Sequence, residues 1–220
     1  MNYNIIGSSS KGNSIILEDI LLLDCGVTYK KLKKYLKNIK LIFISHIHKD
    51  HLLPTTIKQI AFNYPNIKFI CGSKDVVKKL VDCNIDRRNI FYMKPDKWYS
   101  LGIIQFRLEK VTHDVENYCI KVKFTKFNKK MIYIVDTANV DNIEAKDYDL
   151  YLIESNYRED ILQKHIEECD DESKLYYLDR VPRTHLSNEQ ANSFLIENMG
   201  KNSQYQFIHC SDYNFEERDE

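Results

Sequence analysis

Short apolar runs of strand length alternate along the chain with segments whose apolar residues recur at helical spacing. A continuous apolar run is typical of a buried strand, whereas a covering helix has apolar residues three and four positions apart. The pattern predicts strands at Ser14–Leu17, Ile20–Leu23, Leu41–Ile44, Lys68–Cys71, Ile103–Leu108, Tyr118–Phe124, Met131–Val135, Leu150–Ile153 and Gln206–His209. This many strands requires a large sheet or two packed sheets.

Helical periodicity and capping residues mark the segments between these strands. The predicted helices are Tyr29–Leu36, Thr55–Phe62, Lys74–Leu80, Asp160–Glu168 and a segment that begins after Ser187. Ser73 is a candidate N-cap, and Ser187-x-x-Gln190 resembles a capping box, in which polar side chains satisfy free N–H groups. Gly200 is expected to close the last helix. The chain therefore reads as a mixed α/β protein.

Three polar features are interpreted as solvated surface. The acidic segment Glu167–Glu172 is predicted to be a loop, and Glu216–Glu220 an acidic tail. Charge runs of this kind lie more often in solvent than in binding sites. His165 falls on the polar, amphipathic helix Asp160–Glu168, so we expect an exposed histidine outside any site.

Composition narrows the class of protein. The 220 residues include 43% hydrophobic and 29% charged residues but only 6 Gly and 4 Pro, which is typical of one ordered globular domain spanning 1–220. Lys plus Arg equals Asp plus Glu at 32 each, so no global positive field exists, although a local basic face could. Six cysteines without C-x-x-C spacing, no signal-like N-terminus and no long apolar run predict a reduced, cytoplasmic protein without a membrane partner.

The strongest chemical signal follows the apolar run Leu41–Ile44. The segment Ser45-His46-Ile47-His48-Lys49-Asp50-His51 places three imidazoles and a carboxylate where a strand gives way to a loop. In an extended segment residues i and i+2 share a face, so His46 and His48 can grip one ion while Asp50 and His51 face a neighbouring position. Four such groups would carry a large desolvation cost if no cation balanced them. The cluster therefore predicts a metal site.

This cluster resembles the H-x-H-x-D-H signature of the metallo-β-lactamase superfamily. The resemblance continues in order along the chain, through Leu23-Asp24-Cys25-Gly26, Val111-Thr112-His113 and Ile134-Val135-Asp136-Thr137. It implies an αβ/βα sandwich, in which two mixed β-sheets face each other and helices flank them. The metal site would then lie in strand-end loops along one edge.

The same resemblance implies a ligand set for two divalent metal ions. One ion would be held by His46, His48 and His113, and the other by Asp50, His51 and His209, with Asp136 between them. His185 competes with His209 for the last position, and His209 is preferred because it follows an apolar strand. Zinc suits this donor set best, and manganese stays open. Asp24 is interpreted as an acceptor that orients the metal-binding histidines.

Within the superfamily, the chain resembles the YycJ/WalJ-like branch, which is related to tRNase Z and other phosphodiesterases. The residues concerned are Gly7–Ser14, Glu154-Ser155-Asn156 and His185-Leu186-Ser187-Asn188. In such relatives a histidine paired with a glutamate donates a proton, which here implies His185 and Glu154. Tyr157, Arg183-Thr184 and Cys210 depart from the branch pattern.

These resemblances imply a metal-dependent hydrolase. We expect a phosphodiesterase that acts on nucleic acid, as an exonuclease does, or on nucleotide phosphodiesters, including cyclic nucleotides. Two metals about 4 Å apart would activate a water held by Asp50 and Asp136. A thioester or lactam hydrolase of the same fold and a non-catalytic, metal-stabilised binding protein remain alternatives. A homodimer is left open.

Other residues admit both a functional and a structural interpretation. Ser8–Asn13 could cradle a phosphate through backbone N–H groups, or could form a tight turn. The lysines of the Tyr29–Leu36 helix could meet phosphates, but their spacing favours a solvated face. Trp98 and Tyr99 could stack on a base or pack against the protein.

Overall fold

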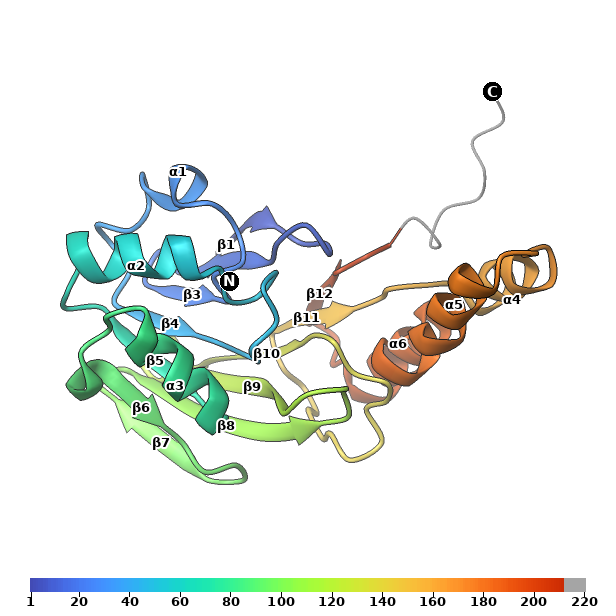
Figure 1. The fold of residues 1–220 in the computed structure, drawn as a ribbon. Coiled ribbons are helices and arrows are strands. Elements are labelled where there is room, and N and C mark those ends of the chain that lie inside the picture. The colour runs from blue at the N-terminus through green and yellow to red at the C-terminus, as the bar shows by residue number, and fades with distance from the viewer. Residues whose placement is uncertain (212–220) are drawn as a thin grey trace.

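The computed structural model describes residues 1–211, and the predicted acidic tail Glu216–Glu220 lies outside the described residues. This part of the chain forms two six-stranded sheets (Figure 1). The first has the order β1 (Tyr3–Gly7), β2 (Ser14–Leu17), β3 (Leu21–Leu23), β4 (Leu41–Phe43), β5 (Lys68–Cys71), β6 (Ile90–Tyr92). The second has the order β12 (Gln204–Ile208), β11 (Leu150–Glu154), β10 (Lys129–Ile134), β9 (Asn117–Phe124), β8 (Ile104–Val111), β7 (Trp98–Leu101).

Both sheets are mixed, and the strand directions bring several carboxyl ends to one edge. In the first sheet β1, β2 and β3 pair antiparallel, and β3 to β6 pair parallel. In the second, β7 to β10 pair antiparallel, and β10, β11 and β12 pair parallel. Strands β8, β10, β11 and β12 therefore point the same way, so the loops that follow them gather together.

The main core lies between the two sheets. Leu23 and Phe43 of the first sheet pack with Phe106, Tyr133 and Leu152 of the second, all essentially buried. The rings of Phe43 and Tyr133 meet edge to face with centroids 6.4 Å apart, a favoured aromatic geometry. Burial of these apolar side chains supplies the main driving force for the sandwich.

Helices cover the outer faces of both sheets. α1 (Tyr29–Leu32), α2 (Pro54–Asn63) and α3 (Lys74–Asp82) pack on the first sheet, and α6 (Asn188–Asn198) packs on the second. In β2, Ile15 faces the main core while Ile16 faces the outer helices, so both faces of the strand are buried. This explains why its sequence is apolar without alternation.

α4 (Glu159–Glu167) and α5 (Glu172–Thr184) form a separate helical pair that extends from the sandwich (Figure 1). A small cluster of Tyr157, Leu162, Leu178 and Val181 holds the pair together. No helix within residues 1–211 is long and apolar enough to cross a membrane.

Most predicted elements are confirmed, but some boundaries and elements were wrong. β2 and β5 match their predictions residue for residue, and the Ser73 cap and the Ser187–Gln190 capping box are both present. Strands β1, β6 and β7 and helix α5 were not predicted, because their half-exposed sequences lack a clear apolar run or stripe.

Three further predictions need correction. The helix that begins at Tyr29 ends at Leu32, and residues 33–38 continue as turns. The predicted acidic loop narrows to residues 168–171, because Glu167 ends α4 and Glu172 begins α5. Gly200 does not cap α6, which ends at Asn198; a side chain at Gly200 would instead collide with Asp147.

Candidate metal centre

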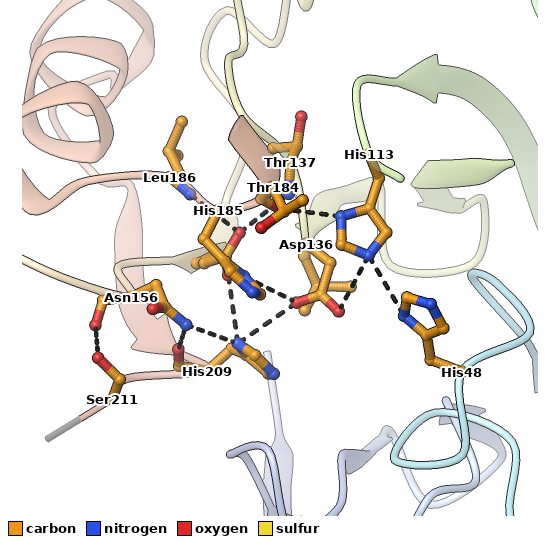
Figure 2. Close-up of polar contacts among 12 residues, drawn as sticks. His48, His113, Asp136, Thr137, Asn156, Thr184, His185, Leu186, His209 and Ser211 are labelled. Carbon is orange, nitrogen blue, oxygen red and sulfur yellow. Dashed lines mark hydrogen bonds and ion pairs between the residues drawn. The ribbon is translucent and has the colours of Figure 1, made fainter. Parts of the chain in front are cut away.

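The residues expected at the metal site follow strands that end at one edge of the sandwich. His113 follows β8, Asp136 follows β10, Glu154 ends β11 and His209 follows β12. The loop 46–51 follows β4 of the facing sheet. Figure 2 shows side chains from these loops converging around Asp136. Residues far apart in sequence are thereby brought within hydrogen-bonding distance.

A first group consists of His46, His48, His113 and Asp136, with one potential ligand atom of each within 4.8 Å of the others. His46 Nε2 lies 3.0 Å from His48 Nδ1, and His113 Nε2 lies 3.3 Å from the same atom. His113 Nδ1 lies 2.9 Å from the Thr184 carbonyl, which can only accept, so Nε2 presents its lone pair to the group. Three imidazole nitrogens converge as a zinc-type site requires.

A second group consists of Asp50, His51, Asp136 and His209. His51 Nε2 lies 3.1 Å from Asp136 Oδ2 and 3.3 Å from Asp50 Oδ2. His209 Nε2 lies 3.6 Å from Asp50 Oδ2. This group contains His209, not His185, which is the arrangement that the sequence favoured. Two carboxylates and two imidazoles form a donor set suited to a divalent transition metal.

Asp136 belongs to both groups. Its Oδ2 lies 3.3 Å from His46 Nε2 and 3.1 Å from His51 Nε2. Its Oδ1 is buried and makes no hydrogen bond with any described residue, and the same holds for His209 Nε2. Buried polar atoms without hydrogen bonds are rare and costly. Cations among these atoms would satisfy both, so the residues present fit a dinuclear metal site.

Two imidazoles of the first group, those of His46 and His113, are held neutral. Burial and the nearby charge of His51 lower the pKa of His46 to about 4, because a buried cation is poorly solvated. Burial likewise lowers the pKa of His113. Neutral imidazole is the form that binds a metal.

The second group has the opposite tendency. Burial by itself lowers the pKa of His51, but the carboxylates of Asp136 and Asp24 raise it well above its usual value. The pKa of His209 rises to about 10, because Asp136 and Asp50 outweigh burial. Without metals, protons on these histidines supply the positive charge that the buried carboxylates require.

His185 and Glu154 form a third group with Asp136 and His209. His185 Nδ1 lies 2.7 Å from Glu154 Oε1, and Glu154 Oε2 accepts from the backbone N–H of Thr137 at 3.0 Å. Glu154 is fully buried. Burial by itself lowers the pKa of His185, but the Glu154 carboxylate raises it overall, so the protonated form is favoured. The pair can hold a proton beside the two metal groups.

Asp24 orients His51, as the sequence predicted. Its Oδ2 lies 2.7 Å from His51 Nδ1 and accepts from the Tyr133 hydroxyl at 2.7 Å, while its Oδ1 accepts from the Ser45 N–H at 2.8 Å. Asp24 is fully buried at φ 58°, in the left-handed region that Asp tolerates better than most residues. The Tyr133 contact comes from the opposite sheet, and the sequence contained no local signal for it.

The loop that contains Ser8–Asn13 braces the centre. Asn13 Nδ2 lies 3.0 Å from His51 Nε2 and 3.3 Å from Asp50 Oδ2. Ser8 Oγ accepts from the backbone N–H of His209 at 2.7 Å. The turn therefore ties the loop 46–51 to the end of β12, a role that the sequence interpretation did not include.

Sequence reasoning gave no role to two residues next to the imidazoles, Asp114 and Asn156, although Asn156 belongs to the motif Glu154-Ser155-Asn156. Asp114 Oδ1 lies 3.1 Å from His113 Nε2 and 3.4 Å from His48 Nε2, and Asp114 forms an ion pair with Arg180 of α5. Asn156 Nδ2 lies 3.0 Å from His209 Nδ1. Each adjoins a residue that the sequence did single out, and that adjacency was the available signal.

The structure shows where the residues lie whose interpretation, functional or structural, the sequence left open. The Trp98 ring packs under Lys123 Nζ, 4.0 Å from the ring centroid, and Tyr99 packs against the main core. Lys30, Lys31, Lys33 and Lys34 are exposed, as expected. His165 lies outside all three groups, but it is half-buried rather than exposed because it faces the α4–α5 contact.

Fold and site together define a protein with the metallo-β-lactamase fold and a His/Asp centre that fits two metals. The chain resembles the metallo-β-lactamase fold protein YhfI from Bacillus subtilis, with a TM-score of 0.70 and 16% identity, covering 97% of this chain and 87% of that one. The chain also resembles human tRNase Z, short form, with a TM-score of 0.68 and 15% identity, covering 96% of this chain and 93% of that one. A third similar structure is a diphosphatase from the PhnP family, with a TM-score of 0.61 and 12% identity, covering 94% of this chain and 85% of that one.

No protein-family model matches this sequence, and no curated protein sequence matches it either. The structural neighbours confirm the predicted superfamily fold and do not distinguish the YycJ/WalJ-like branch, which stays a prediction.

Proposed function

We propose that this protein is a dinuclear, metal-dependent phosphodiesterase that acts on nucleic acid or nucleotide phosphodiesters. One observation carries the proposal: a buried Glu154 holds His185 beside two groups of converging metal-ligand atoms that share Asp136. Two of the structural neighbours, tRNase Z and a diphosphatase, act on phosphate-containing molecules according to their names, which supports the same class of chemistry.

The assigned ligands follow the geometry of the two groups. His46, His48 and His113 would hold one ion, and Asp50, His51 and His209 the other, with Asp136 between them. When bound, the ions would supply an activated water and neutralise charge on the phosphoryl oxygens. Zinc is preferred for the histidine-rich donor set, and manganese remains to be compared with it.

The protein's own groups provide proton transfer and orientation. His185 would protonate the leaving oxygen, and the 2.7 Å contact with Glu154 holds the ring in position and favours its protonated form. Asp24 and the Thr184 carbonyl fix the rings of His51 and His113 through their Nδ1 atoms. An alkoxide leaving group needs such a proton donor, and this need favours a phosphodiester over a thioester, whose leaving group is a better one.

Hydrolysis of bis-p-nitrophenyl phosphate by the metal-replete protein, with zinc and with manganese, tests the proposal. We expect turnover by the wild type and loss of turnover in His48→Ala. His185→Ala should lower kcat by roughly 10²- to 10⁴-fold on a dinucleotide, whose alkoxide leaving group needs a general acid, and much less on bis-p-nitrophenyl phosphate, whose nitrophenolate leaves without a proton. Metal content measured in parallel should fall only in His48→Ala.

His165→Ala is the matched control, because His165 lies on α4 outside the three groups. Its turnover and metal content should match the wild type. A thioester and a β-lactam are tested alongside. A wild type that holds two metals, cleaves either carbonyl substrate and leaves every phosphodiester intact would overturn the proposal in favour of a carbonyl hydrolase.

A further inference from the structure

A basic hollow lies directly beside the second metal group. Its volume is about 350 Å³, within the range of small-ligand sites. The hollow, here called the lysine hollow, has Ser10, Lys11, Lys31, Lys49 and Asp50 in its lining. Asp50 therefore belongs both to the metal group and to the wall of this hollow.

Two sequence features of unassigned role meet in this hollow. Ser10 and Lys11 come from the turn 8–13, and Lys31 comes from the lysine run on α1. Lys49 lies between the metal-loop residues His48 and Asp50. Of the four lysines in the α1 run, only Lys31 lines the hollow. The fold thus places only one of these four lysines in the hollow, although the sequence does not distinguish among them.

The charges of the hollow are unbalanced. Lys11, Lys31 and Lys49 are exposed, and none of them forms an ion pair within residues 1–211. Asp50 is the one carboxylate in the lining, and its Oδ2 faces His51 and His209 at 3.3 and 3.6 Å. Three ammonium groups around one hollow attract an anion with several oxygens, such as a phosphate.

We propose that the lysine hollow binds a backbone phosphate of a nucleic acid strand, adjacent to the phosphodiester that the metal centre cleaves. This inference rests on the proposed function and specifies its substrate. A single phosphodiester carries one negative charge, which the metal centre would neutralise. A strand carries further phosphates, and one beside the scissile linkage can meet the lysines of the hollow.

Binding of a strand provides a test that does not depend on turnover. The probe is a fluorescein-labelled ten-nucleotide oligothymidylate with phosphorothioate linkages, and its anisotropy is measured with metal-replete protein at several NaCl concentrations. We expect Lys11→Ala, Lys31→Ala and Lys49→Ala each to weaken binding about 3- to 5-fold. Each should also reduce the slope of log Kd against log salt by about 0.7, the value for one phosphate contact on a single strand.

Lys30→Ala is the matched control, because Lys30 is exposed on the same helix and does not line the hollow. It should leave both the affinity and the salt slope unchanged. Equal effects of Lys30→Ala and Lys31→Ala would indicate diffuse attraction to the surface and would overturn the proposal, as would unchanged binding in all three lining variants.

Cleavage of a strand with one uncharged linkage locates the contact. A methylphosphonate beside the scissile linkage should lower kcat/KM of the wild type on one side only. In the variant that combines Lys11→Ala with Lys31→Ala, the same methylphosphonate should lower kcat/KM by a smaller factor than in the wild type, because the phosphate has already lost its partners. An equal decrease of kcat/KM in both proteins would count against the lysine hollow.

The two proposals fail in different ways. A wild type that binds the strand through the three lysines and cleaves no phosphodiester would disprove the proposed function and retain the binding site. The opposite result is a wild type that cleaves both strands and bis-p-nitrophenyl phosphate, while the lysine variants leave the ratio of kcat/KM for the strand to kcat/KM for bis-p-nitrophenyl phosphate unchanged. It would retain the function and disprove the binding site.

Discussion

The two metal groups share Asp136 but differ in charge. Each has one partly exposed side chain, His48 at 34% in the first and Asp50 at 24% in the second, and the other side chains are almost completely buried. The first contributes three imidazoles, and the second adds the Asp50 carboxylate. Asn13, Asp24 and Asn156 each contact a histidine ring nitrogen of the second group.

This contrast shows how one edge of a sandwich can build two unlike sites. In the first group burial lowers the pKa values of His46 and His113, so these two rings can receive a cation without losing protons. The second group surrounds buried carboxylates and keeps its histidines protonated until a cation replaces those protons. We therefore expect the second group to bind metal in a strongly pH-dependent way and the first group much less so.

Removal of the shared carboxylate should have the largest effect. Asp136→Asn takes away the one group that both sites use, so we expect loss of both ions and a decrease in turnover of about 10³-fold or more. Metal analysis and hydrolysis of bis-p-nitrophenyl phosphate measure the two effects. Asp141→Asn is the control, because Asp141 is exposed in the same connection between β10 and β11. Retention of two ions by Asp136→Asn would refute the shared role.

Loss of the Asp24 carboxylate should separate the two sites. Asp24→Asn removes the charge that contacts His51 directly, whereas Asp24 reaches His46 of the first group only through the Ser45 hydroxyl. Metal affinity of the second site should fall by about 10- to 100-fold, the usual cost of losing such a partner. Titration of the metal-free protein with zinc should then resolve one tight and one weak site. An equal loss at both sites would show that Asp24 supports the whole edge rather than His51.

The pH dependence of the metal-free protein should reveal the protonated second group. The pKa of His209 is raised from 6.5 to about 10, so its contribution to stability is fully present below about pH 6.5 and is lost as the pH rises through 10. The urea midpoint of the metal-free protein should therefore fall between pH 7 and pH 10. The metal-loaded protein should show little change there. Parallel curves for the two forms would contradict the charge assignment.

A smaller effect is expected from the bracing residue Asn156. Asn156→Ala removes the amide that contacts His209 Nδ1 at 3.0 Å and the His209 carbonyl at 3.0 Å. We expect a loss of about 1 to 2 kcal/mol in unfolding free energy, since a buried hydrogen-bonding amide is removed. Zinc affinity of the second site should weaken a few-fold. Asn192→Ala, on the outer helix α6, provides a comparison that should leave zinc affinity unchanged.

Much of the fold and of the candidate site follows from local sequence. The run Ser14–Leu17 was correctly predicted as a strand, and His46, His48, Asp50 and His51 stand together because a short loop carries all four. These predictions succeeded because the strand period and the spacing of residues in the loop can each be recognised within a few consecutive residues. The same logic failed for β7 and α5, whose exposed faces carry little apolar pattern.

By itself, the sequence determined the strand-and-helix alternation and the residues able to bind metal, because these depend on local periodicity and side-chain chemistry. Only the tertiary structure decided which strand ends meet. It placed Tyr133 on Asp24 across the sandwich, Ser8 on His209, and Lys31 rather than Lys30 in the lysine hollow. Such contacts join residues up to 201 positions apart, and they arise from strand direction and the packing of two sheets, which no short stretch of sequence encodes.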